Sequence, residues 1–579
     1  MPQSPWTDVG PLEALPLEAP ALRVLDGNRV VLVRLPDDAV HAVDDQCPHE
    51  GYPLSKGTLQ GCVLTCLWHN FKFDVRTGHC LKGDEAVRLY PTRVVDGAVQ
   101  VDLTPPPPEA AIARSRRSLA EALRTPRVGQ ALRDVARLLH LGVPATDLAA
   151  ALAADDAERA EYGTTHVLAV LAVLLESLPA EPPLAAVAPL GLAVELLAEA
   201  HPGRSPRTPR PSIDPGDDFD AAGERLRAAV EAERVDEALG LVQGACARGW
   251  SRRIPGSWFL PLVADHFLDF GHALLYAVHV EDLLDRVGWH HAPAILPGLV
   301  LRIVHGTRED TLPTWRWFTT RLGALEPELA ALRAVPGTVP VAPEALVTAL
   351  LDGPREAAVT APLEALRAGV TLEAVMDAIV YVASERILRF DPAHDPDDHV
   401  QEGWLDVTHT LTFARGVRLA LGRWPHPRAL RLLFQAARFA HHARNLDAPG
   451  GLVLPPPDPA ATLDDLASAL RRHDPSAALS AAQGYLAAGG PMDPLRALLL
   501  GHATADTSAT RPIFAAHLLK TVAAALAETE ALPEGPRRTL PLLAAVRLLA
   551  SSLRERQTTR LAHEAIQLVA HGKVPRTLT

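Results

Sequence analysis

The chain has 579 residues, which is too long for one compact core and predicts two to four domains. Its net charge of −13, with no long run of Lys or Arg, argues against a nucleic-acid-binding protein. Residues Met1–Gly10 lack the basic and apolar regions of a secretory signal, and no apolar stretch reaches the roughly 18 residues of a spanning helix. We therefore expect a cytoplasmic protein with no membrane span and no nucleic-acid partner.

Residues 1–104 have the pattern of a small all-β domain, because short β-branched runs alternate with turn residues. The expected strands are Arg29–Leu35, Val40–Val43, Val63–Cys66 and Phe71–Val75. The segment Arg93–Val101 predicts a β-hairpin that turns at Asp96 and Gly97, since this pair tolerates the positive φ angles of a tight turn.

Four potential metal ligands stand within this β-rich region. Cys47 and His49 are one residue apart, and after sixteen intervening residues Cys66 and His69 follow with two residues between them. Two thiolates on one iron and two imidazoles on the other bind a [2Fe–2S] cluster of the Rieske type. Zinc accepts the same donor set, but a β-rich region without a helix to carry a histidine pair argues against it.

The ligand spacing resembles the Rieske family, whose pattern is Cys-x-His followed after a similar interval by Cys-x-x-His. The resemblance covers about residues 6–103. The flanking residues that also agree with it are Pro53, Leu54, Gly57, Phe73, Asp74, Thr77 and Gly78. It implies a [2Fe–2S] cofactor, with an electron-donating reductase as partner and His49 and His69 as the edge at which electrons enter and leave.

Three positions depart from the pattern of the Rieske proteins of respiratory complexes. Tyr52 and Trp68 stand where those proteins carry a pair of bridged cysteines, and Phe71 stands where they carry a serine that donates to a cluster sulfur. Fewer donors to the sulfurs favour the oxidised cluster, so we expect a reduction potential of about −150 mV, at the low end of the Rieske range. Such a potential is typical of the ferredoxin and oxygenase branch, which receives its electrons from a reductase.

The rest of the chain predicts a large all-α domain. Four consecutive prolines begin an expected linker over residues 105–118, and residues 119–579 are rich in Ala, Leu and Arg at helical spacing. Two segments, Phe267–Ala277 and Trp404–Ala414, share the pattern aromatic-Leu-Asp-x-x-His, and weaker matches surround His166 and His517. These matches predict internal repeats. The expected units are about 119–215, 216–335, 345–448 and 460–579.

The two stronger matches each contain an Asp and a His three residues apart, Asp269 with His272 and Asp406 with His409. On a helix such a pair shares one face, so two equivalent helices would supply two carboxylates and two imidazoles to one metal, as the acidic-x-x-His pairs of di-iron bundles do. We interpret these four residues as a candidate catalytic metal site. Further candidate ligands are His166, His266, Glu385 and His517. For each histidine, a role in the core or on the surface remains the alternative.

The same two segments, with the Ala- and Leu-rich helical pattern, make the helical part resemble questin-oxidase-like proteins. That family includes oxidative ring-opening enzymes. Its members generally lack a Rieske domain, so the resemblance assigns neither a substrate nor an electron path.

Two functions are therefore compatible with the sequence. In the first, the cluster accepts electrons from a reductase and delivers them to a non-haem iron or another metal in the helical domain, for O2-dependent oxidation of a small organic substrate. In the second, the protein is a non-catalytic electron carrier or redox sensor whose helical domain docks a partner. The sequence is also compatible with a homo-oligomer.

Overall fold

The protein is described by a computed structural model that covers residues 5–82, 85–178, 182–335, 337–395, 403–505 and 512–551, with five isolated positions beyond them, 562, 566, 567, 570 and 571. The chain divides into two compact units, Met1–Val143 and Pro144–Thr579.

The first unit contains three small antiparallel sheets, with strand orders β1-β11-β10, β2-β3-β4-β9 and β5-β6-β7-β8. The strands are β1 (Trp6–Pro11), β2 (Pro20–Leu25), β3 (Asn28–Arg34), β4 (Val40–Asp44), β5 (Thr58–Gln60), β6 (Val63–Thr65), β7 (Lys72–Asp74), β8 (Cys80–Lys82), β9 (Leu89–Tyr90), β10 (Thr92–Val95) and β11 (Ala98–Asp102). Alternate residues of β3 face two different cores, because side chains of a strand point to opposite faces. Val31 and Val33 join one core, and Val30 and Leu32 join the other.

The strand and hairpin predictions for this unit are confirmed. The four expected strands coincide with β3, β4, β6 and β7 to within one residue at every end. The predicted hairpin joins β10 and β11, and its turn residues Asp96 and Gly97 have φ angles of 49° and 77°.

Two helices complete the first unit, α1 (Pro108–Arg124) and α2 (Val128–His140), and they pack against each other. The expected linker over 105–118 is therefore wrong for most of its length, because α1 begins at Pro108. Proline fits the first position of a helix, where its missing N–H is not needed, so the end of a proline run begins the helix here.

The second unit is all-α over its described residues, apart from isolated β-bridges. Its helices are α3 (Ala145–Arg159), α4 (His166–Ser177), α5 (Val187–Ala200), α6 (Phe219–Glu231), α7 (Val235–Ala247), α8 (Leu260–Asp265), α9 (His272–Val287), α10 (Ala292–His305), α11 (Pro313–Ala324), α12 (Glu326–Ala334), α13 (Glu344–Asp352), α14 (Ala357–Arg367), α15 (Leu372–Arg389), α16 (Trp404–Arg423), α17 (Ala429–His442), α18 (Leu463–Arg471), α19 (Pro475–Ala487), α20 (Met492–Ala503), α21 (Pro512–Ala531) and α22 (Leu540–Ala550).

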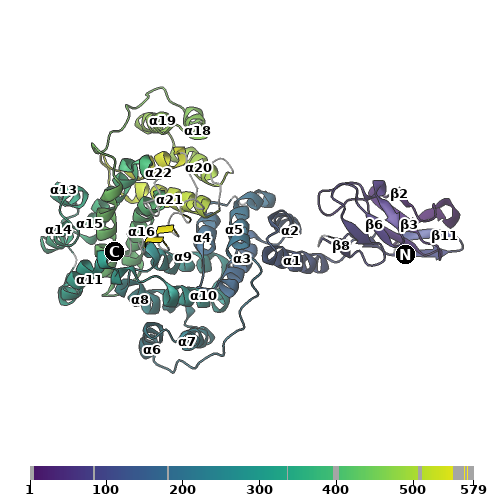
Figure 1. The fold of residues 1–579 in the computed structure, drawn as a ribbon, viewed down its shortest axis with the longest axis horizontal. Coiled ribbons are helices and arrows are strands. Elements are labelled where there is room, and N and C mark those ends of the chain that lie inside the picture. Colours follow the sequence, from purple (N-terminus) through teal and green to yellow (C-terminus); the bar gives the residue numbers. More distant parts are fainter. Residues whose placement is uncertain are drawn as a thin grey trace. The chain divides into compact units, whose positions relative to one another are not determined.

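Four of these helices form a closed ring at the centre of the unit (Figure 1). Helix α4 packs on α9, α9 on α16, α16 on α21, and α21 on α4. A helix inside such a ring must be apolar on most of its surface, and all eight residues from Val167 to Leu174 of α4 are buried. The ring brings together segments that lie more than 330 residues apart in the chain.

Each ring helix is followed along the chain by a helix that packs against it, in the pairs α4–α5, α9–α10, α16–α17 and α21–α22. The four predicted repeat units contain one such pair each, and the repeat itself stays a prediction. Among the described residues, one helical stretch, Pro183–Ala200, is long and apolar enough to cross a membrane, and half of it is buried inside the protein as in a core helix.

Candidate metal centres

The first candidate centre is built by two loops of the β unit that have the same backbone design. The N–H of Cys47 donates to the carbonyl of Tyr52 at 3.0 Å, and the N–H of Cys66 donates to the carbonyl of Phe71 at 2.8 Å. Each loop thus closes five residues after its cysteine. The residue before the closing carbonyl has a positive φ in both loops, 76° at Gly51 and 60° at Asn70.

These loops bring the four predicted ligands together. Cys47 and Cys66 are 3% and 1% exposed, whereas the His49 and His69 rings lie nearer the surface with their centroids 4.7 Å apart. Burial raises the pKa of Cys47 to about 12, so a thiolate there needs a strong compensating charge. Iron supplies that charge, and buried thiolates with outer imidazoles are the donor arrangement of a Rieske [2Fe–2S] cluster.

The side chains around the ligands show what occupies the three departing positions noted in the sequence. Tyr52 and Trp68, in place of bridged cysteines, stack with an interplanar angle of 8° and centroids 6.2 Å apart. Phe71, in place of a serine donor, stacks on the His49 ring at 4.5 Å. Aromatic contacts therefore replace a covalent bridge and a hydrogen bond. None of the five cysteines, all of which the structure describes, forms a disulfide.

The second candidate centre lies inside the four-helix ring, where each ring helix contributes one histidine: His166, His272, His409 and His517. The Nε2 atom of His409 lies 3.2 Å from Nε2 of His272 and 3.0 Å from Nε2 of His517. The His166 ring is 4.8 Å from that of His272 and 4.7 Å from that of His517, between centroids. Ligand atoms of His166, His272 and His517 lie within 4.8 Å of one another.

Backbone carbonyls fix the orientation of two of these rings. His272 Nδ1 donates to the carbonyl of Asp269, and His517 Nδ1 donates to the carbonyl of Ile513, both at 2.6 Å. A neutral imidazole with its proton on Nδ1 presents a lone pair on Nε2. The lone pairs of both rings therefore face the Nε2 of His409, which can donate at most one proton.

A bound metal ion would resolve this arrangement of facing lone pairs. Metal–nitrogen bonds of about 2.0–2.1 Å place the nitrogens of neighbouring ligands about 2.9–3.4 Å apart, which matches the observed 3.0 and 3.2 Å. Metal-bound histidines also commonly donate their other ring N–H to a backbone carbonyl, as His272 and His517 do. His166 Nε2 and His409 Nδ1 have no hydrogen-bond partner among the described residues.

The electrostatics favour neutral imidazoles, the form that binds a metal. Burial lowers the pKa of all four histidines, to about 3 for His409. Lys520, one helical turn after His517, is also fully enclosed, and burial lowers its pKa to about 7. Its Nζ has no hydrogen-bond partner among the described residues. The Lys520 amine, close to the four imidazoles, can therefore exchange a proton near neutral pH.

The two predicted aspartates have different positions. Asp269 lies in a 3-10 turn before α9 with a φ of 48°, so the expectation that it shares a helical face with His272 is wrong. Its carboxylate accepts from the Thr307 N–H at 2.9 Å and lies 2.9 Å from Arg302 Nε. Its carbonyl, and not its carboxylate, contacts His272. Asp406 does share α16 with His409.

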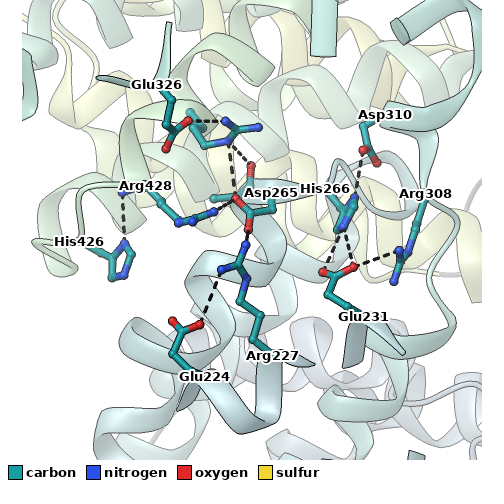
Figure 2. Close-up of polar contacts among 12 residues, drawn as sticks. Glu224, Arg227, Glu231, Asp265, His266, Arg308, Asp310, Glu326, His426 and Arg428 are labelled. Atoms are coloured by element: carbon teal, nitrogen blue, oxygen red, sulfur yellow. Dashed lines mark hydrogen bonds and ion pairs between the residues drawn. The ribbon is translucent and has the colours of Figure 1, made fainter. Parts of the chain in front are cut away.

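Two other predicted ligands belong to ion-pair networks instead. His266 lies between Asp310 at 3.0 Å and Glu231 at 3.2 Å (Figure 2). Glu385 pairs with Arg389 at 2.5 Å. Neither is in the group of converging histidines, and both have partners that explain their burial without a metal.

Sequence reasoning missed Lys520 and the buried carboxyl of Glu309. A lone lysine three residues after His517, inside the apolar stretch of α21, was the available signal for the first. Glu309 accepts from the N–H of Phe270 at 2.7 Å, and the Phe270 ring stacks on His409 at 5.9 Å between centroids. Glu309 thus supports a residue that packs against the centre.

A cavity of about 740 Å³ lies between α4, α9, α16, α20 and α21. Leu275, Thr412 and Lys520 line it, and each follows a histidine of the centre by three residues, or about one helical turn. The cavity therefore begins about one turn beyond the imidazoles. Its walls combine apolar side chains such as Val278 and Leu526 with several charged ones.

Comparisons with known proteins concern the first unit. The family described as Rieske [2Fe-2S] domain matches residues 5–93. The ferredoxin subunit of anthranilate 1,2-dioxygenase from Burkholderia cepacia is 33% identical over 100 residues, which are 17% of this chain and 92% of that protein. The ferredoxin component of the naphthalene 1,2-dioxygenase system from Pseudomonas aeruginosa is 29% identical over 102 residues, 17% of this chain and 96% of that protein. The ferredoxin of carbazole 1,9a-dioxygenase from Nocardioides aromaticivorans, a solved structure, is 30% identical. The match covers 17% of this chain and all of that protein, with a TM-score of 0.17.

Proposed function

Because this chain belongs, through its N-terminal domain, to the Rieske [2Fe–2S] family, we propose that it is an oxidoreductase with two metal centres. Cys47, His49, Cys66 and His69 hold the cluster, which accepts single electrons from a reductase. The four ring histidines hold a second metal that receives them, for O2-dependent oxidation of a small organic substrate. An imidazole-rich site suits iron, copper, nickel or zinc, and the redox role favours iron or copper.

The convergence of His166, His272, His409 and His517 carries this proposal. Imidazoles from four helices meet here. Three of them are buried, with the Nε2 of His409 3.2 Å from that of His272 and 3.0 Å from that of His517, and their facing lone pairs are costly unless something binds them. A docking or sensor domain does not need such a centre. The presence of an electron-transfer domain in the same chain supports a redox role for the four-histidine centre.

The chain's own residues have defined tasks in this proposal. The carbonyls of Asp269 and Ile513 hold the ligand tautomers of His272 and His517. Lys520, with a pKa of about 7, stores or releases a proton beside the metal. Ring helices packed on each other exclude bulk water from the imidazoles.

The size of the adjoining cavity supports the proposal of a small organic substrate. Its volume of about 740 Å³ is within the range of ligand pockets, roughly 300–1,000 Å³. Its mixed apolar and charged walls suit a molecule with an apolar body and a few polar groups. The match to ferredoxin components of dioxygenase systems supports a reductase as the electron donor.

Metal and sulfide analysis tests the proposal. We expect the purified protein to contain two irons and two sulfides in the cluster, with one further metal ion per chain. His409→Gln and His517→Gln should each lose the further metal and keep the cluster, whereas Cys66→Ser should lose the cluster and keep the further metal. His290→Gln, a change at an exposed histidine of the helical unit, is the matched control.

A wild-type protein with two irons, two sulfides and no further metal after anaerobic reconstitution would show that the four histidines bind none. The chain would then act as an electron carrier or redox sensor, which is the alternative function.

A further inference from the structure

A second cavity in the helical unit is surrounded by basic side chains. Its volume is about 230 Å³, and Arg355, Arg438, His441, His442 and Arg444 line it. The last four come from the C-terminal part of α17 and the turn after it, and Arg355 precedes α14. This cavity and the four-histidine centre share no lining residue or ligand.

Arg438 is the most constrained of these residues. It is 4% exposed, its Nη2 donates to the carbonyl of Thr314 at 3.1 Å, and its Nε has no partner among the described residues. The guanidinium lies over the rings of Trp315 and Trp317, at 4.8 and 5.7 Å from their centroids. Aromatic faces fix its position, but they do not neutralise its charge.

Acidic partners are scarce around the cavity. Within the described part of the chain, neither Arg438 nor Arg444 forms an ion pair, and the one carboxylate on a lining arginine is the exposed Glu356, 2.8 Å from Arg355. Burial, together with the positive charges of Arg355 and Arg444, lowers the pKa of Arg438 to about 10. Buried charges are normally paired, so this cluster lacks a counter-charge.

We propose that this cavity binds a tetrahedral oxyanion, either inorganic phosphate or the phosphate group of a small phosphomonoester. Guanidinium groups match phosphate oxygens with paired N–H donors, and three arginines surround one small space here. The cavity volume of about 230 Å³ equals that of about eight water molecules at roughly 30 Å³ each, which leaves room for the anion but not for a large ligand.

A purely structural role for the cluster is the competing explanation. Arg444 and His441 both donate to the carbonyl of Gly353, so these two side chains already stabilise a turn. Arg355 makes no such contact, and its side chain is 64% exposed. A substitution at Arg355 therefore separates anion binding from folding.

The test is calorimetric titration of the full-length protein with inorganic phosphate in a phosphate-free buffer, with sodium chloride at equal ionic strength as reference. Thermal unfolding in the two salts provides a second readout. We expect saturable binding by the wild type, and about tenfold weaker binding by Arg355→Gln, the loss of one charge-assisted hydrogen bond. Arg367→Gln is the control, because it removes the same charge from the exposed pair with Glu328 outside the cavity.

Arg438→Gln should abolish binding if it folds, and Arg355→Gln keeps the test decisive if it does not. Glycerol phosphate distinguishes the two sources of the anion. Tighter binding than inorganic phosphate identifies a phosphomonoester, and equal or weaker binding identifies free phosphate. Absence of saturable heat in the wild type, or equal affinities of Arg355→Gln and Arg367→Gln, would overturn the proposal.

Discussion

Glu309 offers a quantitative test of the buried charges around the four-histidine centre. Glu309 is 4% exposed, and the carboxylates of Asp269, Asp406 and Asp310 act on it electrostatically. Burial, with these like charges, raises its pKa from 4.5 to about 9. At neutral pH the folded protein therefore holds Glu309 protonated, whereas the unfolded chain ionises it.

Glu309→Gln replaces the carboxyl with a neutral group of the same shape that can still accept from Phe270 N–H. Between pH 4.5 and 9 the unfolded wild type binds fewer protons than the folded one, so its stability falls as pH rises, by about 1.4 kcal/mol per pH unit. The variant has no ionisable group at this position and therefore lacks this pH-dependent loss of stability. It should be more stable than the wild type by about 3 kcal/mol at pH 7 and by about 1 kcal/mol at pH 5.

Urea unfolding followed by tryptophan fluorescence measures this difference. Seven of the nine tryptophans lie in the helical unit, so the signal reports mainly on that unit. Glu364→Gln, an exposed change on α14, is the matched control and should leave the pH profile of stability unchanged. Two results would refute a protonated Glu309. One is a Glu309→Gln protein that is less stable than the wild type at pH 7, and the other is a stability difference between the two proteins that does not change with pH.

Three further predictions concern other parts of the molecule. Gly271→Ala should destabilise the helical unit by about 2 kcal/mol or more, since φ is 85° there and a Cβ would collide with the Phe413 ring; an unchanged urea midpoint would contradict this. His266 has two carboxylate partners that raise its pKa, so His266→Gln should lower stability below about pH 6.5 and have little effect well above the raised pKa; a constant difference between pH 5.5 and 9 would count against it. Phe71→Ser should raise the cluster potential measured by voltammetry, because a hydroxyl can donate to a sulfur; a fall would contradict the sequence interpretation.

The cluster site could be predicted from sequence because its information is local. Cys47 and His49 lie on one short loop and Cys66 and His69 on another, and residue types at fixed spacing specify both the donors and the β-rich support. The positive φ angles at Gly51 and Asn70 occur at residues that tolerate them. The same holds for the hairpin turn at Asp96 and Gly97.

The four-histidine centre was only partly accessible by the same reasoning. Its members were among the candidates, but spacing on one helix suggested Asp269 and Asp406 as companions with equal weight. The turn before α9, where Asp269, Phe270 and Gly271 all have positive φ angles, places the Asp269 carboxylate against Arg302. Periodicity describes a face of a helix and does not state where that helix ends.

The sequence by itself determined the cluster ligands, the order of a β-rich region followed by helices, and the helical secondary structure of the larger unit. Only the tertiary structure decided that the helices close into a ring, that His166 and His517 belong to the same centre as His272 and His409, and that Lys520 is buried beside them. The physical reason is distance along the chain. Local spacing specifies contacts within a loop or a helical turn. The four imidazoles are more than 100 residues apart from one to the next, so they meet only through packing, which the full set of buried side chains decides together.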